Sequence, residues 1–136
     1  MKVLVDTSVW SLALRHKRAA ENDRIRSALA TLVEDGRVAI IGAIRQELLS
    51  GIREQAQFER LRDHLRAFPD MVVTTEDYEE AAAYFNRCRE KGVQGSNTDF
   101  LICAAAVRNG FSIFTTDDDF PFFAKVLPIA LHNEGV

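Results

Sequence analysis

The chain has 136 residues, which is close to the size of one typical domain. Apolar residues make up 47% and charged residues 27%, values of a globular protein rather than a disordered one. The net charge of −3 provides no basic excess, which taken alone argues against a nucleic-acid ligand. No apolar run reaches the about 18 residues of a membrane span, and Asp6 interrupts the apolar start too early for a signal peptide. We therefore expect a single domain over residues 1–136 that is soluble and cytoplasmic and has no membrane partner.

Short apolar runs recur along the chain and predict strands. They are, in chain order, Lys2–Val5, Val38–Ile41, Met71–Val73, Ser112–Thr115 and, after Pro128, Ile129–Leu131. Between them the apolar residues have helical spacing. Helices are expected directly after Val5, over 23–35, over 42–51, from there to 68, over 76–91 and from Ser96 or Asn97 to Asn109. This alternation predicts an α/β/α sandwich in which helices flank a mostly parallel central sheet.

Carboxylates follow several of the expected strands. Asp6 comes directly after the first strand, Glu47 lies in the helix after the second, Asp99 lies in the first turn of a later helix, and 117–119 is a run of three aspartates after the fourth strand. Each acid alone is explained by helix capping or by a solvated position. In open parallel sheets, however, the functional crevice lies beyond the carboxyl ends of the strands. The sequence therefore predicts that these acids meet at one edge of the sheet.

Carboxylates that converge repel one another, and several of them need a multivalent cation when they are buried together. Ligands that are all oxygen atoms favour hard ions such as Mg²⁺ or Mn²⁺. The histidines His16, His64 and His132 lie outside the acidic segments and lack metal-ligand spacing, which disfavours zinc. The cysteines Cys88 and Cys103 form no CxxC motif, so both are expected to be reduced and buried.

Four segments, in order, resemble the signature segments of PIN-domain ribonucleases, in particular the VapC-type toxins of toxin–antitoxin pairs. They are VDTSVW at 5–10, RQELLSG at 45–51, NTDFLICAAA at 97–106 and IFTTDDDF at 113–120. The resemblance implies a PIN-like α/β/α sandwich and a Mg²⁺- or Mn²⁺-dependent endoribonuclease with an RNA substrate. It also implies inhibition by a cognate VapB-type antitoxin, a homodimer and a toxin–antitoxin hetero-oligomer.

Position by position, the resemblance assigns two overlapping sets of acids. The catalytic set is Asp6, Glu47, Asp99 and Asp117, and the metal-binding set is Asp6, Asp99, Asp117 and Asp119. Asp118 stands where similar sequences often have a basic or polar residue. Which aspartate of this run points inward stays open, with Asp117 favoured before Asp119.

Residues beside the acids are expected to support the site or to contact RNA. Thr7, Ser8 and Thr116 are candidates for holding the acids or touching phosphate, although helix capping explains Thr7 and Ser8 equally well. RNA contact is expected from the basic segment that includes Arg15, Lys17 and Arg18. The charged helix before Pro69 is a second candidate, with a solvated face as the plain alternative.

The expected chemistry is hydrolysis of an RNA phosphodiester bond by a metal-activated water, which leaves 5′-phosphate and 3′-hydroxyl ends. One alternative is a PIN-like RNA- or protein-binding module without nuclease activity, which has no need of the complete acidic set. Another is a different Mg²⁺-dependent phosphohydrolase, such as a phosphatase of the haloacid dehalogenase kind; Ser8 stands where that enzyme needs a second acid. Without the six candidate site acids, 17 basic residues face 14 acidic ones, so the remaining surface is mildly basic.

Overall fold

The computed structural model describes residues 1–14 and 20–132 of the chain. The RNA contacts expected at Arg15, Lys17 and Arg18 therefore lie outside the described residues, as does His16. In chain order the elements are β1 (Val3–Val5), α1 (Thr7–Ala13), a 3₁₀ turn (Ala20–Asn22), α2 (Asp23–Glu34), β2 (Val38–Ala39), α3 (Gly42–Leu49), α4 (Gln55–Leu65), α5 (Thr75–Glu90), α6 (Asn97–Asn109), β3 (Ser112–Phe114) and α7 (Phe120–Ala124).

A parallel three-stranded sheet forms the centre of the fold, with strand order β2-β1-β3. The central strand β1 is wholly buried. Its unbroken Val-Leu-Val sequence is typical of a strand that is covered on both faces. Leu4 is in register with Ala39 on one side and with Ile113 on the other, and Val5 is in register with Phe114. Because the strands are parallel, β1 and β3 deliver the residues that follow them to the same edge of the sheet.

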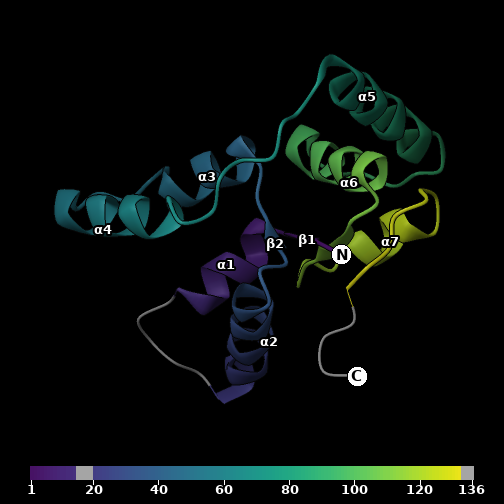
Figure 1. The fold of residues 1–136 in the computed structure, drawn as a ribbon. Coiled ribbons are helices and arrows are strands. Elements are labelled where there is room, and N and C mark those ends of the chain that lie inside the picture. Colours follow the sequence, from purple (N-terminus) through teal and green to yellow (C-terminus); the bar gives the residue numbers. More distant parts are fainter. Residues whose placement is uncertain (15–19, 133–136) are drawn as a thin grey trace.

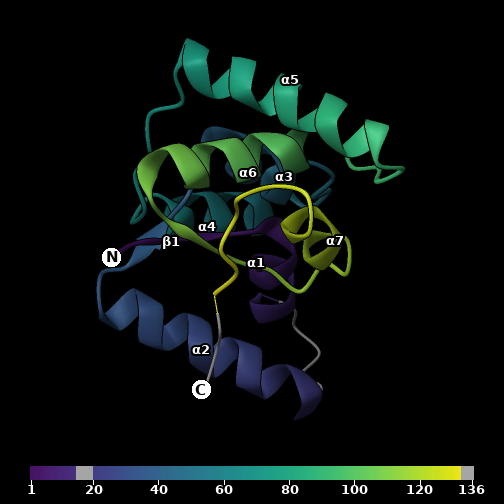
Figure 2. The same ribbon diagram turned by 90° about the vertical axis from the view of Figure 1, so that its right-hand side faces the viewer.

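Helices cover both faces of this sheet, so the expected α/β/α sandwich is confirmed. Figure 2 shows α5 and α6 above β1 and α1 and α2 below it. Figure 1 shows α3 and α4 extending to one side, beyond β2. Helix α6 is buried from Phe100 to Ala106 because it lies between α5 and the sheet, and its three consecutive alanines permit close packing on both sides. None of the helices in the described part of the chain is long and apolar enough to cross a membrane.

The expected strand at Met71–Val73 is wrong. Only the residue before it, Asp70, pairs with the sheet, through a single parallel bridge to Ile40. Val72 is 78% exposed, so its side chain has no sheet face to cover. The chain then enters the capping box of α5 at Thr74, which leaves too little length for a ladder of backbone hydrogen bonds.

The expected strand at Ile129–Leu131 is reduced to one bridge. Leu131 pairs with Ile113 in parallel, and the Ile113 N–H donates to the Ala130 carbonyl at 2.8 Å. The chain therefore passes beside β3 and pairs with it at one point, without extending the sheet.

The expected helices over 23–35, 42–51, 76–91 and 97–109 are confirmed as α2, α3, α5 and α6. The charged helix α4 ends at Leu65, earlier than expected, because Arg45 from α3 donates to the carbonyls of Leu65 and Phe68 and stabilises a non-helical turn there. Phe68 then packs edge-on against Trp10, which is buried in the core.

Gly95, just before α6, lies against two buried aromatic rings. A Cβ atom at this position would lie 2.6 Å from Cζ of Phe123 and 3.1 Å from Cε2 of Phe100. Gly95→Ala is therefore expected to lower the free energy of unfolding by about 1–3 kcal/mol, the usual cost of overpacking a core. Urea unfolding measures this loss. The matched control is Gly42→Ala, whose Cβ would meet its nearest atom at 3.6 Å and whose unfolding free energy we expect to be unchanged or higher. Equal stabilities for the two variants would show that a Cβ atom at Gly95 does not overpack the core.

Candidate active site

Asp6 is a nearly buried carboxylate at the carboxyl end of β1, with 5% of its surface exposed. It is the N-cap of α1, where it accepts a hydrogen bond from the Ser8 backbone N–H at 3.4 Å. The same oxygen, Oδ2, also accepts from the Ser8 hydroxyl at 2.7 Å and from the Thr115 hydroxyl at 2.9 Å. Helix capping and burial thus place this side chain in one orientation, in which Oδ1 accepts no hydrogen bond from a described residue.

The two hydroxyls that hold Asp6 also hold the loop that follows β3. Thr115 Oγ1 accepts from the Asp117 backbone N–H at 3.0 Å, and Ser8 Oγ accepts from the Thr116 backbone N–H at 3.0 Å. Each hydroxyl therefore donates to Asp6 and accepts from a backbone amide of the 116–117 segment. This network connects the ends of β1 and β3 and sets the position of Asp117 relative to Asp6.

Asp99 lies in the first turn of α6 and is half-buried. Its carboxylate accepts from the Ser96 backbone N–H at 3.0 Å, and its own backbone N–H donates to the Ser96 hydroxyl at 3.1 Å, which completes a capping box. Burial raises the pKa of Asp99 and outweighs the lowering effect of these hydrogen bonds; the charges of Asp117 and Asp6 raise it further.

Glu47 reaches the same region from α3. Its Oε1 accepts a hydrogen bond from the Thr7 hydroxyl at 3.2 Å, so Thr7 connects α1 to α3. Although Glu47 lies at the surface, its pKa is raised, and loss of hydration is the largest cause. The Thr7 hydrogen bond lowers this pKa, whereas the negative charges of Asp6 and Asp99 raise it further. Glu47 and Asp99 thus both experience the charge of Asp6.

The three consecutive aspartates after β3 have different surroundings. Asp117 is half-buried, and its Oδ1 accepts from the Asp119 backbone N–H at 2.9 Å. Asp118 and Asp119 are exposed, and Asp119 is the N-cap of α7 without a side-chain capping hydrogen bond. Of the three, only Asp117 is among the charges that raise the pKa of Asp99. The structure therefore groups Asp117 with the other acids and leaves Asp118 and Asp119 at the rim.

Four acids predicted from the sequence thus come together from four separate segments: Asp6, Glu47, Asp99 and Asp117. None of the groups that shift the pKa values of Glu47 and Asp99 is a cation. Within residues 1–14 and 20–132, however, no three His, Cys, Asp or Glu side chains are close enough to enclose a metal ion as they stand. The site is a loose cluster of negative charge, and no described cation contributes to the pKa shifts of Glu47 and Asp99.

Thr115 is the polar residue that sequence reasoning missed, because Thr116 was expected in the supporting role. Thr116 is exposed and contributes its backbone N–H, whereas the Thr115 side chain contacts Asp6. The spacing of Thr115 from Asp117 could have identified it, because side chains two residues apart along an extended chain point to the same side. By that signal Thr115, two residues before Asp117, belongs with the acid.

The two cysteines, and two of the three phenylalanines of α7, belong to the core. Cys88 and Cys103 are free and buried, as expected. Burial raises the pKa of the Cys103 thiol far above its usual range, so it stays protonated. Phe120 and Phe123 of α7 are fully buried, whereas Phe122 is exposed, with the Lys125 ammonium 5.1 Å from its ring centre.

Comparison with known proteins places the chain in a family. Over 126 residues the chain is 29% identical to VapC ribonuclease Mb1587 of Mycobacterium bovis, and the match covers 91% of this chain and 92% of that protein. Ribonuclease VapC11 of Mycobacterium tuberculosis matches with the same identity and coverage.

Solved structures share the fold. FitAcB from Neisseria gonorrhoeae has a TM-score of 0.76 at 21% identity, over 96% of both chains. VapBC2 from Rickettsia felis, solved bound to a DNA fragment from its promoter, has a TM-score of 0.78 at 18% identity, over 98% of both chains. The family model of the PIN domain matches residues 3–126, so the chain belongs to the PIN domain family.

Proposed function

We propose that this protein is a Mg²⁺- or Mn²⁺-dependent endoribonuclease and the toxin of a toxin–antitoxin pair. The observation that carries the proposal is the convergence of Asp6, Glu47, Asp99 and Asp117 at one edge of the sheet, where no cation contributes to the pKa shifts of Glu47 and Asp99. The VapC ribonucleases at 29% identity support RNA as the substrate.

The donor set fits a hard divalent cation. All candidate ligands are carboxylate oxygens, and Asp6 presents Oδ1 while its Oδ2 is held by Ser8 and Thr115. Asp6, Asp99 and Asp117 would hold the ion, with Asp119 as a further ligand at the rim. When bound, the ion would polarise a phosphodiester oxygen and lower the pKa of a water molecule.

The chain's own groups have distinct proposed roles around that ion. Glu47, held by Thr7, would orient the attacking water or accept its proton, because its raised pKa brings it closer to that of a general base. Ser8 and the segment after β3 keep Asp6 and Asp117 in place. Thr7 and Thr116 are proposed to contact phosphate.

The resemblance to toxin–antitoxin proteins also supports the proposed partners. The solved relatives include VapBC2 and a toxin–antitoxin complex from Klebsiella pneumoniae, the latter with a TM-score of 0.64 at 20% identity. On this basis we propose a VapB-type antitoxin partner, a homodimer within a toxin–antitoxin hetero-oligomer, and a cytoplasmic location for a protein whose residues 1–136 act as a single domain.

The proposed activity is tested by incubating the purified protein and its Asp6→Asn variant with total RNA in Mg²⁺, Mn²⁺ or EDTA. We expect cleavage by the wild type with either metal, and intact RNA with EDTA or with the variant. Intact RNA that is nevertheless bound by the wild type would identify a non-catalytic module. Hydrolysis of a small phosphomonoester without RNA cleavage would identify another phosphohydrolase.

The ends of the products report how the bond is broken. Attack by water on the phosphodiester is expected to leave a 5′-phosphate on one fragment and a 3′-hydroxyl on the other. Mass spectrometry of a cleaved synthetic RNA measures both ends. A 2′,3′-cyclic phosphate would instead show attack by the 2′-hydroxyl and contradict the proposed mechanism.

A further inference from the structure

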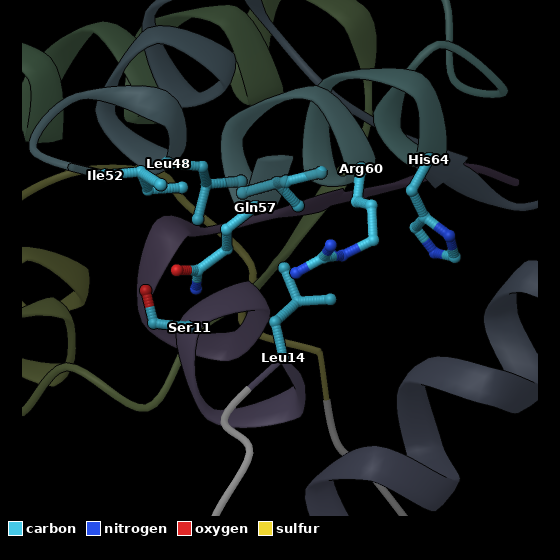
Figure 3. Close-up of a pocket in the computed structure, with 8 residues that line it drawn as sticks. Ser11, Leu14, Leu48, Ile52, Gln57, Arg60 and His64 are labelled. Carbon is cyan, nitrogen blue, oxygen red and sulfur yellow. The ribbon is translucent and has the colours of Figure 1, made fainter. Parts of the chain in front are cut away.

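A groove with a volume of about 510 Å³ lies between α1, α3 and α4. Figure 3 shows Ser11 and Leu14 on its α1 side, facing Leu48, Ile52, Gln57 and Arg60 across it. Among the residues that the structure describes, the walls combine the apolar side chains of Leu14, Leu48, Ile52 and Leu61 with the polar side chains of Ser11, Gln57, Arg60 and His64. A groove of this composition accommodates a ligand that has flat apolar faces and charged groups together.

The inner end of the groove borders the acidic site. Ser11 lies one helical turn after Thr7 on the same face of α1, and Leu48 directly follows Glu47 in α3. The hydrogen bond between Thr7 and Glu47, at 3.2 Å, joins the two walls at this end. From Thr7 to Leu14 the wall formed by α1 extends about 10 Å, at 1.5 Å per residue. One extended ligand can therefore occupy both the candidate site and the groove.

The outer end of the groove carries the guanidinium of Arg60. Arg62 of α4 and Arg66, the C-cap residue of that helix, form ion pairs with Asp63, at 3.0 and 3.8 Å. Arg60 forms no ion pair with a described residue, and in Figure 3 its guanidinium extends from α4 toward Leu14 of α1. His64 follows one turn later. The groove thus runs from the side of the carboxylate cluster toward the guanidinium of Arg60.

We propose that this groove binds the single-stranded RNA next to the scissile bond, with Arg60 contacting a backbone phosphate. This inference rests on the proposed nuclease function. A strand cut in its interior must leave the active site in both directions, and this groove is lined by Ser11 and Leu48, which follow Thr7 and Glu47 on α1 and α3. The charge distribution along the groove matches RNA, because the acidic cluster would hold a metal ion at one phosphodiester and the guanidinium would contact another. Leu48 and Ile52 offer apolar surface to the sugar and base, and Gln57 offers an amide to their polar edges.

Arg60→Gln tests this contact, with Arg62→Gln as the control on the same helix. The readouts are the Kd for a fluorescein-labelled single-stranded RNA in EDTA, and kcat and KM for its cleavage in Mg²⁺. For Arg60→Gln we expect Kd and KM to rise about tenfold, the effect of one charge-assisted hydrogen bond, with kcat nearly unchanged. The slope of log Kd against log salt should fall by about 0.7, the value for one phosphate contact on a single strand. Arg62→Gln should stay close to wild type in each readout.

Ser11→Trp provides a second, steric test because the indole would fill the groove beside the acids without changing its charge. Circular dichroism and thermal melting verify the fold of the variant, and we expect weaker RNA binding and slower cleavage. Arg60→Gln and a folded Ser11→Trp that both bind RNA like the wild type would overturn the proposal and leave the groove to a protein segment. Failure of the proposed nuclease function can be distinguished from failure of this inference. The former is seen as intact RNA after incubation of the wild type with Mg²⁺, whereas RNA binding in EDTA tests the groove.

Discussion

Asp99→Asn is expected to lower the rate of RNA cleavage at least about a hundredfold while making the metal-free protein more stable. The expected loss of activity follows from the removal of one charged side chain that is proposed to bind the metal. A bound cation contributes several kcal/mol to transition-state stabilisation, and each 1.36 kcal/mol is tenfold in rate. The fold is preserved because the asparagine side-chain oxygen can still accept the hydrogen bond from Ser96 that Asp99 accepts at 3.0 Å.

The gain in stability follows from the raised pKa of Asp99. Burial, together with the charges of Asp117 and Asp6, makes the ionised form less favourable in the folded protein than in the unfolded chain. The folded protein therefore binds more protons, and the free energy of unfolding of the wild type falls as the pH rises through the interval between the two pKa values. The gain in the free energy of unfolding from Asp99→Asn is complete at pH values above the folded-state pKa of Asp99. It vanishes below the ordinary aspartate pKa of about 3.9.

Thermal melting in EDTA across this pH range measures the effect, and addition of Mg²⁺ reverses the order, because the ion stabilises the wild type more than the variant. Asp118→Asn is the matched control: Asp118 is exposed and does not contribute to the pKa of Asp99. Its melting temperature and cleavage rate should stay close to those of the wild type. A metal-free Asp99→Asn protein that is less stable than the wild type at pH 7 would contradict the electrostatic account.

Thr115→Val is expected to weaken Mg²⁺ binding about 10–100-fold, the usual effect of removing a group that orients a metal ligand. The substitution keeps the shape of the side chain and removes the hydroxyl that donates to Asp6 at 2.9 Å and accepts from the Asp117 N–H at 3.0 Å. It leaves a nearly buried carboxylate and a backbone amide each with one partner fewer. A loss of about 1–3 kcal/mol in the free energy of unfolding is therefore expected as well.

Thr116→Val separates the role of Thr115 from the general effect of a β-branched apolar residue in this loop. Thr116 is exposed, and its contact with Ser8 uses the backbone N–H, which the substitution keeps. We expect Mg²⁺ affinity, measured by calorimetry, and stability close to those of the wild type. If the two variants lose Mg²⁺ affinity equally, the hydroxyl of Thr115 does not position Asp6.

The place of each acid relative to a strand was the most informative part of the sequence. Asp6 and Asp117 follow β1 and β3 closely, and parallel pairing brings such positions together whatever the details of packing. Helix signals were also reliable, because the capping residues Thr74 and Ser96 act within one turn of chain.

Features that depend on distant partners were not predictable. The segment 71–73 has the composition of a strand, but whether it pairs depends on how β2 and Asp70 are arranged around it. Helix α4 is ended by Arg45, whose guanidinium reaches carbonyls about 20 residues away. Helix α7 was not predicted for a different reason. It is only five residues long and begins with Phe120 and Pro121, so it is too short to show a periodic pattern.

The network around Asp6 also determines when during synthesis the protein can become active. Thr115 lies 109 residues after Asp6, and both β3 and Asp117 belong to the last quarter of the sequence. The N-terminal part of a chain leaves the ribosome first, so Asp6 and Glu47 emerge long before the residues that complete the acidic cluster. A fragment that ends before β3 lacks a neighbour of the central strand as well as the hydroxyl that orients Asp6. Under the proposed function, an N-terminal fragment that ends before β3 is therefore expected not to cleave RNA.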